Sequence, residues 1–150
     1  MAKKTNKISV NRFYRCTLQD GTKKEFYVND MNDQGEFEVE NAHDRAKSTE
    51  RVKDLSNGNN MEEVDPDEIG MTEPKDVARF LARELFDNKV LDQNRAVTVV
   101  QKKFGDAYVV KTGNFALAEK VKRHFRKLYA GWADWNPDAK CWEARKSAYT

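Results

Sequence analysis

The residues best suited to acid–base, nucleophilic or metal chemistry are few and far apart in this sequence. The histidines are His43 and His124, and the cysteines are Cys16 and Cys141. No partner is placed to orient either histidine as a base, and the cysteines match no metal-binding or redox spacing. There is also no glycine-rich phosphate loop and no nucleophile elbow. An enzyme is therefore the least expected class, and the sequence indicates no cofactor and no small-molecule substrate.

The densest group of candidate metal ligands is an acidic cluster in the middle of the chain. It consists of Glu62, Glu63, Asp65, Asp67 and Glu68. Such carboxylates could hold a hard cation such as calcium, but an EF-hand-like loop requires a glycine at its centre, and this segment contains Pro66 instead. We therefore predict no metal site.

The chemistry that the sequence favours is the binding of a polyanion. Residues 73–150 hold 16 lysines and arginines against 10 aspartates and glutamates, net +6, whereas residues 43–72 hold 4 against 8, net −4. A basic half joined to an acidic segment favours a partner such as nucleic acid, for which the acidic segment could compete. The alternative interpretation is a solvated charged surface.

The basic residues gather on one predicted helix and the hairpin that follows it. At about 100° per residue, a helix over residues 115–129 places an apolar stripe on one side, made of Leu117, Ala118, Val121, Phe125 and Leu128. The opposite side carries Lys120, Arg123, Arg126 and Lys127. These four residues, with Lys140, Arg145 and Lys146 of the hairpin, are the candidate nucleic-acid-binding residues.

Two further helices are predicted ahead of this one. The first runs from Pro74 to about Lys89, and the second follows Asp92 as N-cap and ends at Gly105. A short strand over 107–111 and a turn at Gly113 and Asn114 come next, and a hairpin over 132–145 closes the unit around a turn at 136–139. Three helices and a hairpin are the outline of a winged helix-turn-helix module. Either Val90 and Leu91 supply its first strand, or this is an α+β unit that only resembles that fold.

The core and the tryptophans of this unit can also be anticipated. We expect these apolar residues to be buried together: Phe80, Leu85, Val100, Phe104, Val121, Phe125 and Leu128. Trp132, Trp135 and Trp142 lie on the hairpin beside the basic helix. We favour the interpretation that they close the core, with at least one left exposed, over the alternative that they stack on bases.

The same stretch, from about Glu73 to Lys146, resembles a small bacterial and phage-borne domain of unknown function. The residues that carry the resemblance are Leu91, Asp92, Gln93, Ala96, Phe104, Gly105, Gly113, Asn114, Val121, Phe125, Arg126, Lys127, Leu128, Trp135, Trp142 and Arg145. The resemblance implies an independently folding unit and assigns no activity.

The N-terminal part is predicted to be a small β unit. Strands over 12–18, 24–28 and 36–40, separated by turns at 19–21 and 29–35, form a three-stranded antiparallel meander within residues 1–42. Phe37 and Val39 face the core, and Glu36, Glu38 and Glu40 face water. Residues 43–72 lose this periodicity and are predicted to be an acidic flexible linker. The expected fold class is therefore α+β, with a winged-helix-like domain over 73–150.

Two classes of function remain open. One is a nucleic-acid-binding module, and the other is a phage-type adaptor or inhibitor that binds a host protein through the meander edge or the acidic segment. The apolar runs are too short for a membrane span, and nothing at the N-terminus resembles a secretory signal, so we expect a cytoplasmic protein with reduced thiols.

Overall fold

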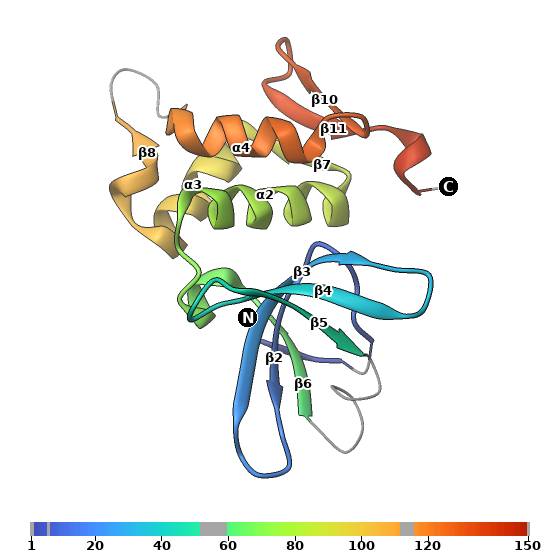
Figure 1. The fold of residues 1–150 in the computed structure, drawn as a ribbon. Coiled ribbons are helices and arrows are strands. Elements are labelled where there is room, and N and C mark those ends of the chain that lie inside the picture. Colours follow the sequence, from blue (N-terminus) through green and yellow to red (C-terminus); the bar gives the residue numbers. More distant parts are fainter. Residues whose placement is uncertain (1, 6, 52–59, 112–115, 150) are drawn as a thin grey trace. The chain divides into compact units, whose positions relative to one another are not determined.

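The computed structural model describes residues 2–5, 7–51, 60–111 and 116–149. The chain divides into two compact units, Met1–Met71 and Thr72–Thr150, which are described one at a time. The architecture is α+β, with three α-helices and antiparallel sheets among these residues (Figure 1).

The N-terminal unit is built around one six-stranded antiparallel sheet. Its strands are β1 (Lys3–Lys4), β2 (Phe13–Thr17), β3 (Lys23–Met31), β4 (Glu36–Asn41), β5 (Lys47–Arg51) and β6 (Asn60–Val64). They lie in the order β1-β6-β2-β3-β4-β5, so that β2 to β5 form a meander and β6 returns to pair with β2. A short 3-10 helix, η1 (Pro66–Ile69), follows β6.

Local sequence explains the first hairpin of this sheet. Asp20 and Gly21 form the turn, in which Gly21 takes a φ of 90° and the Thr22 N–H donates to the Asp20 carboxylate at 2.9 Å. Adjacent residues of β2 point to opposite faces of the sheet, and both faces are covered. Tyr14 belongs to one buried apolar cluster and Phe13 to another. The predicted hairpin is therefore confirmed, and β2 is a central strand.

The structure corrects the predictions of a three-stranded meander and of a linker over 43–72. That range contains β5, β6 and η1, and residues 52–59 lie outside the described residues. The acidic side chains of β6 give the segment a solvated composition, yet they face arginines on and next to β2. Arg15 Nη1 of β2 lies 4.0 Å from Glu62 Oε2, and Arg12 Nη1, one residue before β2, lies 3.1 Å from Glu63 Oε2. Met61 and Val64, on either side of the two glutamates, are buried. The strand is thus held by its pairing with β1 and β2, by these buried side chains and by the ion pairs, and composition alone reveals none of them.

The acidic side of β4 is also only partly as predicted. Phe37 and Val39 are buried, as expected, and Glu38 is exposed. Glu40, in contrast, is buried at 3% exposure, where its carboxylate accepts a hydrogen bond of 2.9 Å from Arg45 Nη1. A buried carboxylate requires such a partner. The three glutamates therefore do not form one solvated stripe.

The C-terminal unit alternates helices with short strands. Its elements are α2 (Pro74–Asn88), β7 (Val90–Asp92), α3 (Gln93–Phe104), the 3-10 helix η2 (Asp106–Tyr108), β8 (Val109–Val110), β9 (Ala116–Leu117), α4 (Glu119–Tyr129), β10 (Ala133–Asn136), β11 (Cys141–Ala144) and the 3-10 helix η3 (Lys146–Tyr149). One sheet has the order β10-β11-β7, and β8 pairs with β9 in a second. The first two predicted helices are confirmed as α2 and α3. Asp92 is the N-cap of α3, as predicted, because its carboxylate accepts hydrogen bonds from the Asn94 and Arg95 N–H groups.

Three features at the middle of this unit bear on the predictions. Val90 and Leu91 do form a strand between the first two helices. The third helix begins at Glu119 rather than near residue 115, because Ala116 and Leu117 pair with Val110 and Val109 as strands. Residues 107–111 hold the end of η2 as well as β8. The predicted turn at Gly113 and Asn114 lies outside the described residues.

One apolar core holds the helices of this unit against its three-stranded sheet. Of the seven residues expected there, Phe80, Leu85, Val100, Val121 and Phe125 are buried. Phe104 and Leu128 are only partly buried and pack at its border. Trp142 of β11 completes the core, with its ring centroid 5.0 Å from that of Phe125. The hairpin is thus packed directly against α4.

Candidate nucleic-acid interface

Helix α4 presents two chemically opposite faces. Val121 and Phe125 are at most 1% exposed and anchor the helix in the core. Upstream, the Ala118 N–H donates to the Tyr108 carbonyl at 2.8 Å, which fixes the start of the helix against η2. The buried side is held rigidly, so the side chains on the outer side project from a fixed backbone.

The outer face of α4 carries the four cations predicted for it. Lys120, Arg123, Arg126 and Lys127 are exposed, and none of them forms an ion pair with another residue that the structure describes. From Lys120 to Lys127 the helix rises about 10 Å. The neighbouring Lys122 differs, because its Nζ lies 3.4 Å from Glu119 Oε2. We call the four unpaired residues the α4 cation face.

The hairpin and the 3-10 helix η3 that follows it supply two further exposed cations. Asn136 organises the turn of the hairpin, since its side-chain oxygen accepts from the Asp138 and Ala139 N–H groups at 3.1 Å. Lys140 is exposed in the left-handed conformation (φ 53°), and its carbonyl accepts from the Gln93 N–H at 3.0 Å. Lys146 is exposed at the start of η3.

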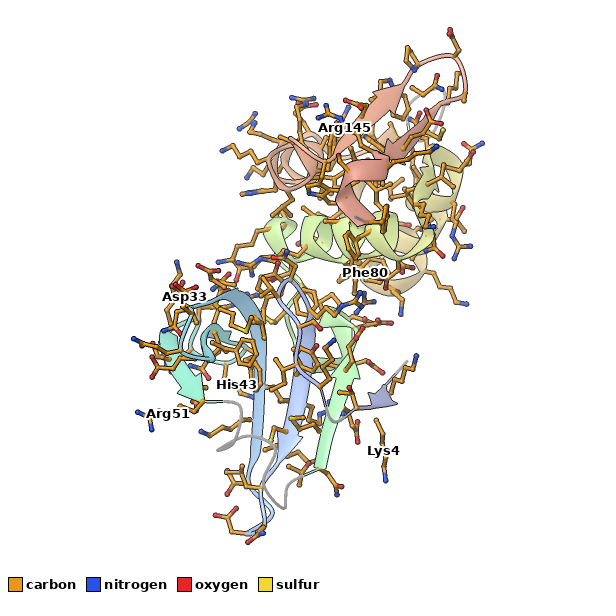
Figure 2. All side chains as sticks on the ribbon, turned by 90° about the vertical axis from the view of Figure 1, so that its right-hand side faces the viewer. Lys4, Asp33, His43, Arg51, Phe80 and Arg145 are labelled. Atoms are coloured by element: carbon orange, nitrogen blue, oxygen red, sulfur yellow. The ribbon has the colours of Figure 1, made fainter. Side chains whose placement is uncertain are left out.

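Arg145 differs from the other predicted binding residues because its charge is already paired. Its Nη2 and Nε atoms donate to both carboxylate oxygens of Asp134, at 2.7 and 2.9 Å, and Nη1 donates to the Gly131 carbonyl (labelled Arg145 in Figure 2). This bidentate contact holds the pKa of the Asp134 carboxyl below its usual range. The arginine therefore ties the base of the hairpin to the end of α4.

The tryptophans divide as the sequence analysis expected. Trp142 is buried, Trp132 is half-buried and donates its indole N–H to the Leu128 carbonyl at 2.8 Å, and Trp135 is 38% exposed. Trp135 and Trp142 border an open cavity of about 310 Å³ between α4, the hairpin and the start of α3. The other residues lining it are Gln93, Leu117, Lys122, Phe125, Arg126 and Tyr129.

Both histidines lie away from this cavity. His124 is exposed and borders a second open hollow, of about 340 Å³, with Lys120, Arg123 and residues of the start of α2. His43 belongs to the other unit, where its Nε2 lies 2.9 Å from Glu25 Oε1 (labelled His43 in Figure 2). The two residues are thus in different settings, one beside cations and one on a carboxylate.

Sequence reasoning missed part of this surface. The candidate binding residues named from the sequence do not include Gln93, Tyr129 or Lys122. Gln93 reaches the cavity because β7 pairs with β11, with Leu91 opposite Trp142 in the register. That pairing brings the start of α3 next to the hairpin. The local sequence pattern does not reveal which strand β7 pairs with. The predicted strand at Val90 and Leu91 was the one signal that the start of α3 could lie beside another strand.

The cysteines and the helices give two further findings. Cys16 and Cys141 are both buried and form no disulfide among the described residues, and burial raises the pKa of each thiol above its ordinary value. None of the helices in the part of the chain that is described has the length and apolarity needed to cross a membrane.

The comparisons with known proteins bear on the C-terminal unit. No curated protein and no solved structure matches the chain. A family model does match, over residues 73–144, which run from the residue before α2 to the last residue of β11. Residues 73–144 are therefore similar to the family of unknown function DUF6953, whose model matches them.

Proposed function

We propose that this chain is a non-enzymatic binding protein whose C-terminal unit binds nucleic acid through the α4 cation face. The observation that carries the proposal is the lack of ion pairs at Lys120, Arg123, Arg126 and Lys127 among the described residues. Four cations fixed on one rigid face create a positive potential that phosphates can neutralise with release of their counterions.

The order of elements supports this proposal. The helices α2, α3 and α4, the strand β7 and the final hairpin follow one another as in a winged helix-turn-helix unit, and β7 lies beside the second strand of the hairpin. The pair β8 and β9, inserted between α3 and α4, departs from that order. In helix-turn-helix proteins one helix enters the major groove while neighbouring parts contact the backbone. We propose that α4 contacts phosphates through the α4 cation face, and that Lys140 of the hairpin and Lys146 of η3 add further phosphate contacts. Arg145 acts through its contact with Asp134, by positioning the hairpin.

Binding of a fluorescein-labelled DNA duplex, followed by anisotropy over a range of salt concentrations, tests the proposal. In the Arg123→Ala/Lys127→Ala variant we expect weaker binding by about the same factor for every sequence. The slope of log K against log salt should flatten by roughly one to two phosphate contacts. Folding should be unchanged, because both side chains are exposed.

A matched control removes two cations elsewhere. The Lys3→Ala/Lys4→Ala variant changes the net charge by the same amount in β1 of the other unit, where both lysines are exposed. It should retain the affinity and the salt slope of the wild type. Equal losses in the two variants would mean that only the total charge matters, and no binding by the wild type even at low salt would remove the proposal.

A second candidate is an adaptor or inhibitor that binds a larger protein. The supporting observation is the open edge of the N-terminal sheet, since β5 pairs only with β4 among the described residues. An exposed edge can accept a strand from a partner. Binding of a basic partner through the glutamates of β4 has less support, because their carboxylates already lie near cations. Arg51 Nε is 3.6 Å from Glu36 Oε2, and Lys47 Nζ is 3.7 Å from Glu38 Oε1. This candidate takes first place if the chain binds no nucleic acid.

A further inference from the structure

The cavity between α4 and the hairpin has walls suited to a flat aromatic group. Four of its lining residues are aromatic: Phe125, Tyr129, Trp135 and Trp142. The centroids of the Trp135 and Trp142 rings are 4.7 Å apart, and the two planes are inclined by 54°. Phe125 and Trp142 are fixed in the core, whereas Trp135 keeps a free ring surface. The volume, about 310 Å³, is at the low end of small-ligand sites and suits one base rather than a helix or a peptide strand.

The polar groups of this cavity are those that read and hold a nucleotide. The Gln93 side-chain amide has both a donor and an acceptor, and neither is used by a described residue. The indole N–H groups of Trp135 and Trp142 likewise have no acceptor among the described residues, in contrast to that of Trp132, which donates to Leu128. Lys122 and Arg126 provide positive charge among the lining residues.

Arg126 connects this cavity to the α4 cation face, because it belongs to both. A strand whose phosphates lie along α4 would therefore have a base within reach of the cavity. Base stacking on aromatic side chains beside a basic groove is the usual way in which proteins hold single strands. The bases of an intact duplex are stacked and paired, so their flat faces are not available to Trp135.

The geometry points to a site for one unpaired nucleobase of a single-stranded nucleic acid, stacked on Trp135 and contacted at its edge by Gln93. This inference rests on the proposed function, since α4 holds the backbone of the same strand. It goes beyond that function by naming the form of nucleic acid: a single strand, or a duplex with an unpaired end, is preferred over a fully paired duplex.

The test compares a short fluorescein-labelled DNA strand with a fully paired duplex of the same sequence, using the full chain. We expect the wild type to prefer the strand by about tenfold, the effect of one stacked base. Trp135→Ala should abolish this preference and leave duplex binding unchanged. Trp135→Phe should retain it, because phenylalanine still offers a ring, and should show less quenching of tryptophan fluorescence by the strand.

The control variant is Tyr149→Ala. Tyr149 is 37% exposed, close to the 38% of Trp135, and its ring packs on Phe86 of α2 instead of lining the cavity. Its removal should not change the preference for the strand. Circular dichroism of each variant checks the fold.

The outcomes separate this inference from the proposed function. Equal binding of strand and duplex, with no effect of Trp135→Ala, would overturn the base site and leave the backbone interface in place. Binding of neither probe at low salt would overturn both. Binding of a free mononucleotide as tightly as the strand would also overturn the inference, because the α4 cation face would then contribute nothing.

Discussion

The two units of this protein use their charged side chains in different ways. In the N-terminal sheet, cations meet carboxylates of other strands: Arg15 Nε of β2 lies 2.7 Å from Glu25 Oε2 of β3, and Lys24 Nζ of β3 lies 3.2 Å from Glu50 Oε1 of β5. The four residues of the α4 cation face, in contrast, have no such partners among the described residues. Both surfaces are rich in charge, so the number of charges does not distinguish them. They differ in whether each charged side chain already has a partner of opposite charge.

The largest expected effect lies in the core beneath the α4 cation face. Phe125 is 1% exposed and its ring contacts those of Tyr129 and Trp142 at 4.9 and 5.0 Å. Phe125→Ala should lower the free energy of unfolding by about 3–5 kcal/mol. Urea unfolding followed by tryptophan fluorescence measures this unit alone, because all three tryptophans belong to it.

Phe104→Ala provides the comparison for that measurement. Phe104 is only partly buried and meets Phe80 edge to face at 5.9 Å. Phe104→Ala should lower the free energy of unfolding clearly less than Phe125→Ala does, because less buried surface is removed. Equal losses would show that the core is not centred under α4.

An intermediate effect is expected for a charge pair of the N-terminal sheet. A double-mutant cycle on Arg15→Ala and Glu25→Ala should give a coupling energy of about 1 kcal/mol, since the pair is hydrogen-bonded and partly shielded from solvent. The same cycle on Lys122 and Glu119, an exposed pair of α4, should give at most about 0.5 kcal/mol. Comparable couplings would remove the contrast drawn between the two units.

The smallest effect concerns the exposed pair at the base of the hairpin. Arg145 lowers the pKa of Asp134 in the folded protein, so the pair stabilises the fold above the pKa of an unfolded aspartate, about 3.9. This contribution is lost as the pH falls through the lower pKa of the folded state. Arg145→Ala should raise the pKa of Asp134 towards its ordinary value, as measured by carboxyl NMR titration. An unchanged pKa would mean that the contact does not persist in solution.

The sequence predicted elements that carry their own local signals. Pro74 and Asp92 indicated the starts of α2 and α3, Gly105 the end of α3, and the Asp20–Gly21 turn the first hairpin. β5 has no such signal, because its residues Lys47–Arg51 include no apolar side chain and it forms by pairing at the edge of the sheet. β9 has only two residues and depends on β8.

The candidate site shows the same division between local and long-range information. The exposed cations of α4 follow from helical periodicity and were predicted one by one. The pairing of Arg145 could not be predicted in the same way, because its partner Asp134 lies eleven positions away along the chain. The cavity needs residues from α3, α4 and the hairpin at once. Their meeting depends on the β7–β11 register, which one sequence does not reveal.

That register has a consequence for the cost of binding. Because β7 joins α2 directly to α3 and pairs with β11, and the Gln93 N–H bonds to the Lys140 carbonyl, the hairpin is tied to the start of α3 as well as to α4. A partner that contacts both α4 and the hairpin meets side chains on a backbone that is already ordered. Little conformational entropy is then lost on association, and affinity depends on the contacts themselves rather than on the folding of a flexible wing.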